Sequence, residues 1–244
     1  MTGKRPEALI ETSEFLHFSL IMYSIPAERT RGLLPPEFEL SDGQTPFLTI
    51  TSYIDSGIRL AGGGWRDAFE QTNYRLHFRE SSNWLIGTSL GSLTAVAQRH
   101  CWSRPWHLSA MEFQVSYDGQ RYRDYRLQTQ SQWVNSYWVI EDSGEMRDRG
   151  PIESRTIDYF QRRDGLLGVS RSAYYDLYGT AGKLRAARCD LLTRLGLLTE
   201  RELMSPTLVT LQSSVRGGYG ASYKAGEEIS FKSADAAVSA IMAP

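Results

Sequence analysis

The sequence predicts a mainly β fold, an antiparallel barrel or sandwich with a few flanking helices. Short β-prone runs follow one another along the chain, with turn residues such as Gly, Pro, Asn and Asp between them. Few helical patterns separate these runs, which argues against a doubly wound parallel sheet. The 244 residues contain no internal repeat and no Pro/Ser-rich linker, so we expect one domain spanning 1–244, with 1–13 and 224–244 peripheral or flexible.

Residues of high β propensity or alternating polarity define the expected strands. A hairpin is expected around Asp118-Gly119, because this pair readily supplies the positive φ of a tight turn. The 133–141 run continues the strand pattern and is expected to end at Asp142-Ser143-Gly144. The expected strands are 15–23, 47–54, 70–78, 84–93, 110–117, 121–134, 133–141 and 208–215.

Helices are expected in a few places only. Residues 25–34 read as a short helix, because Pro26 suits a first helical turn and Pro35 stops it. Apolar residues at helical spacing predict an amphipathic helix within 185–198, and Thr199-Glu200-Arg201-Glu202 fits a capping box that begins another. A terminal helix is expected at 236–242, and Gly62-Gly63-Gly64 is expected to be a flexible loop.

Composition excludes several classes of function. A formal net charge of −1 lacks the basic excess expected of a nucleic-acid reader. The two cysteines, Cys101 and Cys189, are far apart, so we expect both to be reduced, buried and apolar in role. No secretory signal and no membrane-spanning run is visible, so we expect a cytoplasmic protein with no membrane partner.

The segment 99–107 concentrates functional residue types after an apolar strand. His107 can exchange protons near neutral pH, Trp106 offers an apolar wall, and Arg104 can hold an anion. A surface loop with a buried Trp is the simpler alternative. His100, His107 and Glu112 have poor spacing for a metal, so no metal site and no cofactor are expected.

A second candidate lies on the predicted strand 70–78. Asn73, Arg75 and His77 share one face of that strand, where Arg75 could clamp a carboxylate with paired hydrogen bonds. A solvated outer face is the alternative. A third alternating set, 126, 128, 130 and 132, is more simply explained as an exposed face.

Several of these segments resemble the acetoacetate decarboxylase-like superfamily over roughly 14–215. The best matching part is Leu33-Leu34-Pro35-Pro36-Glu37-Phe38-Glu39-Leu40, followed by the strand Phe47-Leu48-Thr49-Ile50. Asn73-Tyr74-Arg75, Gly87-Thr88-Ser89-Leu90-Gly91-Ser92-Leu93 and Arg104-Pro105-Trp106-His107 resemble an uncharacterised branch of that superfamily. The resemblance implies a cone-shaped antiparallel barrel with a mainly apolar internal cavity.

The same resemblance implies a change of chemistry. In the decarboxylase a Pro-Lys-Lys triplet supplies the amine that forms a Schiff base, and one lysine lowers the pKa of the other. That triplet aligns with Pro105-Trp106-His107, which contains no lysine. The four lysines of the chain are Lys4, Lys183, Lys224 and Lys232, so none lies between residues 5 and 182. Schiff-base chemistry is therefore not expected.

Three functions remain open at this stage. One is a structural or interaction module that uses the stretch 184–204, although packing on the barrel explains the apolar face of that stretch more simply. The favoured one is a cofactor-independent enzyme that acts on a small or hydrophobic carbonyl or carboxylate metabolite by decarboxylation, dehydration, aldol-type cleavage or cyclisation, within secondary metabolism. The alternative is a non-catalytic binding protein for a hydrophobic small molecule, and a homo-oligomer is expected in either case. The expected catalytic residues are His107 and Arg75; the expected substrate-binding residues are Trp106, Arg104, Tyr74, His77, Tyr53 and Glu112.

Overall fold

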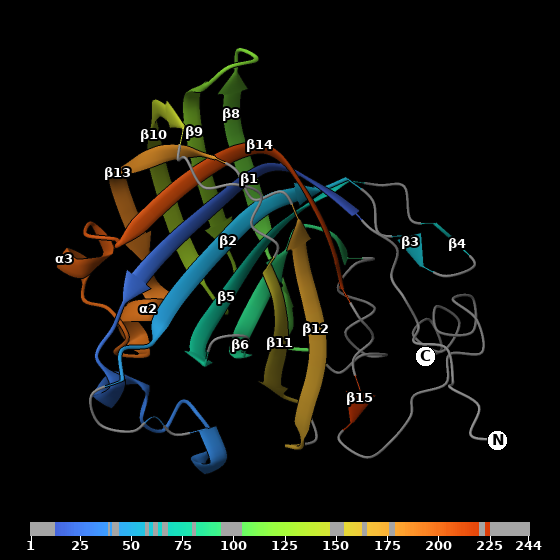
Figure 1. The fold of residues 1–244 in the computed structure, drawn as a ribbon, viewed down its shortest axis with the longest axis vertical. Coiled ribbons are helices and arrows are strands. Elements are labelled where there is room, and N and C mark those ends of the chain that lie inside the picture. Colours follow the sequence, from blue (N-terminus) through green and yellow to red (C-terminus); the bar gives the residue numbers. More distant parts are fainter. Residues whose placement is uncertain are drawn as a thin grey trace.

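Thirteen strands form one large sheet in the structure, a computed structural model, and helices are few and short (Figure 1). The structure describes residues 13–38, 40, 44–56, 59–60, 63–64, 68–79, 82–93, 104–146, 154–162, 165–175, 179–219 and 223–224. The mainly β prediction is therefore confirmed. The helix expected at 236–242, together with His100 and Cys101, lies outside these residues.

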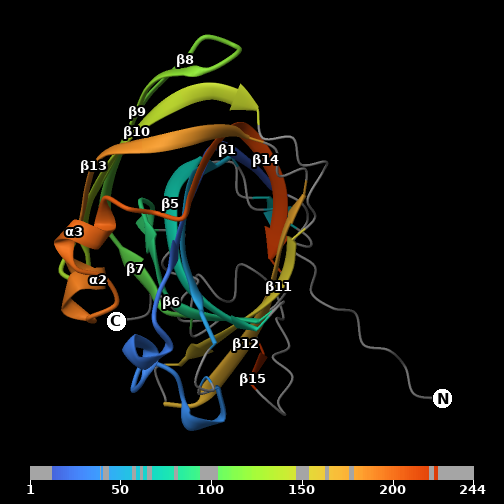
Figure 2. The same ribbon diagram turned by 60° about the vertical axis from the view of Figure 1, so that its left-hand side comes forward.

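Seven strands of the sheet are hydrogen-bonded in a ring, seen nearly end-on in Figure 2. Their order round the ring is β14, β1, β2, β5, β6, β11 and β12, and β12 pairs again with β14. Most neighbours are antiparallel, as expected, but β6 pairs parallel with β11. The bounds are β1 Ser13–Ser24, β2 Phe47–Asp55, β5 Phe69–Arg79, β6 Ser82–Leu90, β11 Ser154–Gln161, β12 Leu167–Tyr175 and β14 Leu208–Tyr219.

Four further strands extend from the ring as an open wing, so the whole sheet is not a closed barrel. The wing follows β14 in the order β13, β10, β9, β8, and it ends at β8. Its bounds are β8 Ala110–Tyr117, β9 Tyr122–Gln130, β10 Asn135–Met146 and β13 Thr180–Cys189. Gly119 has a φ of 95° in the turn between β8 and β9, which confirms the predicted hairpin.

The remaining elements are short. β7 (Trp106–Leu108) pairs parallel with β6, and β15 (Tyr223–Lys224) pairs with β12. β3 (Arg59–Leu60) pairs with β4 (Gly63–Gly64), so two of the three glycines predicted to form a flexible loop are in a strand. None of the helices in the described part of the chain is long and apolar enough to cross a bilayer.

Helix predictions were less accurate than strand predictions. The helical part of the segment 25–34 is the short 3₁₀ helix η1 (Ala27–Thr30). A second 3₁₀ helix, η2 (Pro36–Phe38), follows just beyond the segment. The first part of the helix predicted within 185–198 belongs to strand β13, and α2 (Asp190–Arg194) is its helical part. α3 (Glu200–Leu203) begins at the predicted capping box, where Thr199 accepts from the Glu202 backbone and Glu202 accepts from the Thr199 backbone.

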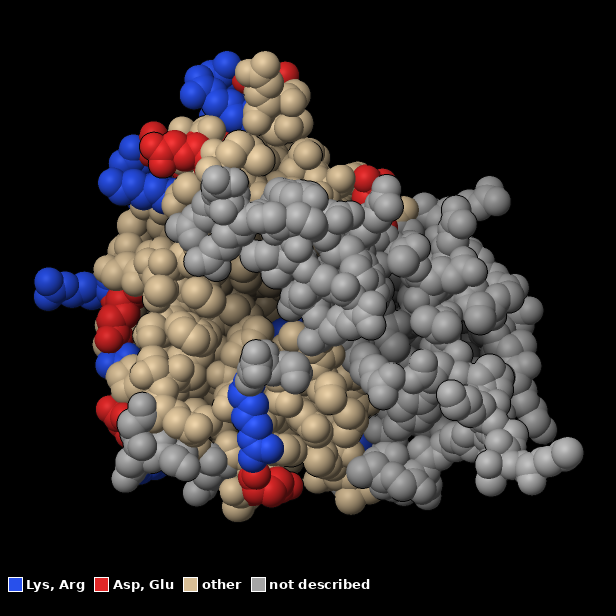
Figure 3. All heavy atoms as spheres, in the orientation of Figure 1, with Lys and Arg blue, Asp and Glu red and all other residues tan. Residues whose placement is uncertain are grey.

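The apolar core lies between the outer face of the ring and the inner face of the wing, where α2 and α3 also pack. Ring strands contribute Ile50, Tyr74 and Leu76, and wing strands contribute Tyr125 and Trp138, all almost fully buried. Burial of the free thiol Cys189 in this core agrees with the predicted apolar role. Charged side chains gather instead at the exposed tip of the wing, where basic and acidic groups lie side by side (Figure 3).

Candidate functional site

The inner face of the ring is polar where β2 and β5 run side by side. Because side chains alternate across a strand, Leu48, Ile50, Tyr74 and Leu76 face the core and the polar residues between them face into the ring. The inward residues of these two strands are Thr49, Thr51, Tyr53, Gln71, Asn73, Arg75 and His77. The expected mainly apolar interior is therefore wrong for this part of the ring.

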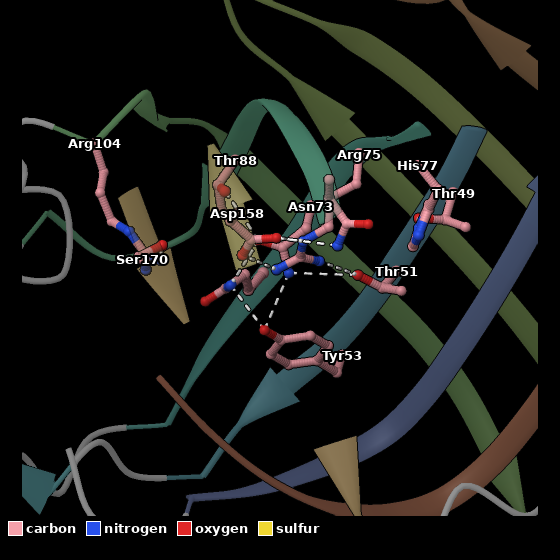
Figure 4. Close-up of polar contacts among 12 residues, drawn as sticks. Thr49, Thr51, Tyr53, Asn73, Arg75, His77, Thr88, Arg104, Asp158 and Ser170 are labelled. Atoms are coloured by element: carbon pink, nitrogen blue, oxygen red, sulfur yellow. Dashed lines mark hydrogen bonds and ion pairs between the residues drawn. The ribbon is translucent and has the colours of Figure 1, made fainter. Parts of the chain in front are cut away.

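Arg75 and Asp158 form an ion pair inside the ring (Figure 4). Arg75 Nε lies 3.1 Å from Asp158 Oδ1 and Nη2 lies 3.4 Å from Oδ2, while the side chains are only 4% and 0% exposed. Asn83 Nδ2 also donates to Asp158 Oδ1, and Arg75 Nη1 donates to Thr51 Oγ1 at 3.2 Å. Arg75 thus directs its paired hydrogen bonds to a carboxylate of the protein itself, whereas the sequence predicted a ligand carboxylate as the partner.

Asn73 is the centre of a hydrogen-bond cluster beside this ion pair. Its Oδ1 accepts from Gln71 Nε2 and from Thr88 Oγ1, both at 2.9 Å. Its Nδ2 donates to the Tyr53 hydroxyl oxygen at 3.1 Å and to Thr51 Oγ1 at 3.4 Å. Since Thr51 Oγ1 also accepts from the guanidinium, the cluster and the ion pair form one continuous buried network.

The Tyr53 hydroxyl has a defined role in this network. Its oxygen accepts from Asn73 Nδ2 and from Gln71 Nε2, the latter at 2.8 Å. The Tyr53 ring packs on Phe15 and Phe18, with centroid distances of 4.2 and 5.8 Å. These contacts fix the ring and thereby the position of the hydroxyl.

A pocket of about 400 Å³ opens at the end of the ring where β2 begins and β5 ends. His77 forms part of its wall, and His77 Nε2 lies 2.8 Å from Thr49 Oγ1. Burial, and then the neighbouring Arg75 guanidinium, lowers the His77 pKa to about 4, so the imidazole is neutral near pH 7. The lining residues are Met22, Leu40, Gln44, Thr45, Pro46, Phe47, Thr49, His77, Phe78 and Arg79.

Arg104 and Trp106 lie on a further part of the inner face. The Arg104 guanidinium stacks over the Trp106 and Phe160 rings, 5.4 and 5.9 Å from their centroids, and donates to Ser170 Oγ. In the ladders, Ser170 lies beside Asp158, and Trp106 lies beside Thr88. Five predicted residues, Tyr53, Arg75, His77, Arg104 and Trp106, therefore face the interior of the ring.

The structure does not bring His107 together with these residues. His107 lies beside Ser89 in the ladder of β7 and β6, so it occupies the face opposite to Trp106. Its ring stacks on Trp133 of the wing, with a centroid distance of 4.2 Å and an interplanar angle of 7°. The imidazole therefore packs between ring and wing and not in the polar interior.

Tyr74 and Glu112 also lie apart from the inner network. The buried Tyr74 faces the apolar core, where its hydroxyl lies 3.3 Å from Ser136 Oγ, and burial raises its pKa well above the ordinary value. Glu112 is exposed on β8, where it accepts from Gln114 Nε2 at 2.6 Å. The alternating set on β9 is largely exposed, as expected, with Arg126 and Gln130 outward.

Sequence reasoning missed Asp158 and Ser170, because neither β11 nor β12 was predicted. The run Thr156-Ile157-Asp158-Tyr159-Phe160 contained the signal, since a carboxylate there interrupts a β-prone stretch. A buried carboxylate requires a partner, so this pattern in a strand predicts an inward-facing carboxylate that pairs with a positively charged side chain.

Comparison with known proteins identifies the fold. No family model matches the chain, and no curated protein does. A solved acetoacetate decarboxylase superimposes with a TM-score of 0.50 at 10% identity, covering 91% of this chain and 90% of that one. The enduracididine biosynthesis enzyme MppR complexed with pyruvate gives 0.48 at 10% identity over 90% of each chain. The acetoacetate decarboxylase of Legionella pneumophila gives 0.44 at 11%, covering 92% and 90%. The first of these likenesses shows that the chain has the acetoacetate decarboxylase-like fold.

Proposed function

We propose that this protein is a cofactor-independent enzyme that acts on a small or hydrophobic carbonyl or carboxylate metabolite inside the ring, without a Schiff-base lysine. The observation that supports this most is the continuous buried network from Tyr53 through Asn73 and Thr51 to Arg75 and Asp158. Buried polar networks are costly to build, and fixed donors in a water-poor site are what carbonyl chemistry requires. The fold shared with acetoacetate decarboxylase supports the same reading.

The proposed chemistry passes through an enolate-type anion. Decarboxylation of a 3-oxo acid and aldol-type cleavage break a carbon–carbon bond, and dehydration begins with loss of a proton from carbon. All three reactions place negative charge on the carbonyl oxygen. The Tyr53 O–H would donate to that oxygen, and the nearby Arg75 guanidinium would stabilise the developing charge at low dielectric. A neutral His77 at the pocket wall would accept or return a proton.

Direct oxygen stabilisation replaces the imine in this proposal. The sequence has no lysine between residues 5 and 182, and Lys183 is exposed on β13 in the wing. An amine nucleophile needs a lowered pKa, which comes from burial or from a neighbouring cation. Lys183 is exposed and lies in the wing, away from the interior of the ring, so the proposal assigns it no chemical role.

The experiment screens 3-oxo acids and 3-hydroxy ketones by proton NMR, with and without sodium borohydride. We expect turnover with no borohydride-fixed adduct in the intact mass. Tyr53→Phe should lower kcat about 100-fold, the usual effect of losing one oxyanion donor, while Tyr137→Phe on the exposed wing should not. A covalent adduct, or full activity of Tyr53→Phe, would refute the mechanism, and loss of activity in His107→Ala would favour His107 instead.

A non-catalytic binding protein for a hydrophobic small molecule is the second candidate. Mutual satisfaction of Arg75 and Asp158 favours it, because a salt-bridged pair can hold the ring together without meeting a substrate. Native mass spectrometry after long incubation separates the two. A ligand recovered unchanged supports binding alone, whereas recovery of a product supports catalysis.

A further inference from the structure

We propose that the pocket at the end of the ring selects monocarboxylates with an apolar body, and that Arg79 binds their carboxylate at the rim. This inference rests on the proposed function, since it names the class of molecule that would enter the ring. Three observations support it: an exposed guanidinium at the rim, apolar walls behind it, and a polar path along β5 toward Arg75.

Arg79 is the charged group among the described residues that line the pocket. Its side chain is exposed and lies over the Phe78 ring, 5.9 Å from the centroid. Among the residues that the structure describes, no carboxylate forms an ion pair with Arg79. A guanidinium with paired donors and no acidic partner matches a ligand carboxylate in both charge and shape.

The walls of the pocket favour an apolar body of moderate size. Met22, Leu40, Pro46, Phe47 and Phe78 supply aliphatic and aromatic surface. A volume of about 400 Å³ is in the range of small-molecule sites, which are largely apolar with a few placed polar groups. Phe47 is 40% exposed, so binding there would bury apolar surface that is now in contact with water.

The pocket also leads toward the buried network. Arg75 and His77 share one face of β5, where same-face neighbours lie about 7 Å apart, and Arg79 follows at the end of the strand after an irregularity at Phe78. Arg75 is deep in the ring, His77 is in the pocket wall, and Arg79 is at the rim. A carboxylate held at the rim would thus place its apolar body between the apolar walls, with its far end toward His77 and Thr49.

The test uses three probes of equal size on the full chain: 3-phenylpropanoate, 3-phenylpropanamide and 3-phenylpropylammonium. Calorimetry should show the carboxylate binding at least tenfold more tightly than the amide, with the ammonium weakest. Arg79→Gln should weaken binding of the carboxylate about tenfold and leave binding of the amide unchanged, because a charged hydrogen bond is lost and the apolar walls remain. Arg201→Gln, an exposed change on α3, is the matched control.

Phe47→Ala should weaken binding of the carboxylate and of the amide by the same factor. Near-ultraviolet circular dichroism checks that each variant is folded. Equal affinity for the three probes, no binding at millimolar concentration, or an unchanged Arg79→Gln would overturn the pocket assignment. These outcomes are independent of turnover. Turnover of a substrate that does not depend on Arg79 would support the proposed function and refute the assignment of Arg79 to carboxylate binding. Carboxylate binding without turnover would support that assignment and refute the proposed function.

Discussion

At the scale of single residues, Arg75 has the greatest influence on the interior. Its charge is removed from water, which is tolerable only because Asp158 supplies the opposite charge and Thr51 Oγ1 accepts a further hydrogen bond. The same guanidinium acts on His77, where it adds to burial in lowering the imidazole pKa. One buried cation therefore sets both the structure of the network and the protonation of the pocket wall.

Replacing one member of the Arg75–Asp158 pair should lower the free energy of unfolding far more than replacing both members. We expect Asp158→Asn to lower the free energy of unfolding by about 3–5 kcal/mol, because it leaves a buried guanidinium without its counter-charge. The double variant Arg75→Met/Asp158→Leu should be more stable than that single variant. Urea unfolding measures both, and an Asp158→Asn loss below about 1 kcal/mol would contradict a buried, fully charged pair.

His77 should make the protein sensitive to mild acid. Its native pKa of about 4 is below the ordinary 6.5, so protons bind the unfolded chain first as pH falls. Stability is therefore complete above pH 6.5 and is lost progressively toward pH 4. Wild type should lose about 1–2 kcal/mol more than His77→Gln between pH 7 and pH 4.5, measured by urea unfolding. Parallel losses in the two proteins would show that other groups dominate.

At the scale of elements, strand faces could be predicted from the sequence and strand partners could not. Asn73, Arg75 and His77 share a face because alternation is local to one strand. Asp158 reaches the same site through a parallel pairing that joins it to Asn83 across 75 positions of sequence. Local patterns do not encode such a pairing, so the acidic half of the network was missed.

The helix predicted within 185–198 begins later than expected, at α2, because residues 185–189 belong to the bulged strand β13. In β13 the buried residues are Thr180, Leu184 and Cys189, at intervals of four and five. The register shifts where β10 and β13 pair, between the partners of Val139 and Ile140, because the strand contains a bulge. An inserted residue replaces even spacing by an interval close to one helical turn, so a bulged strand imitates an amphipathic helix.

Gly87 controls how the wing packs on the ring. A Cβ added at this residue of β6 would lie 2.4 Å from Trp133 Cζ2, closer than carbon atoms approach. We expect Gly87→Ala to lower the free energy of unfolding by about 1–3 kcal/mol, because the indole that also stacks on His107 must move. Urea unfolding measures the loss, with the exposed Ser116→Ala as its control. An unaffected variant would mean that ring and wing are loosely packed.

At the scale of the whole molecule, the ring and the wing have different roles in the structure of the sheet. The ring encloses the polar network, and its outer face joins the wing in burying the apolar core. Interior polar groups can then stay satisfied by one another while apolar burial stabilises the fold from outside the ring. This division explains how one sheet holds a charged interior and a conventional core together.

The same division predicts a gradient of local stability. β1, β2 and β5 are each paired on both sides and largely buried, whereas β8, among the strands that the structure describes, pairs only with β9 and is exposed at alternate residues. Amides that open only with global unfolding exchange slowest, and those at a poorly covered edge exchange by local fraying. Hydrogen exchange followed by mass spectrometry should therefore show the greatest protection in peptides from β2 and β5 and the least in peptides from β8. Equal protection of β8 and β5 would mean that the edge of the wing is covered in solution, for example by a second copy of the chain.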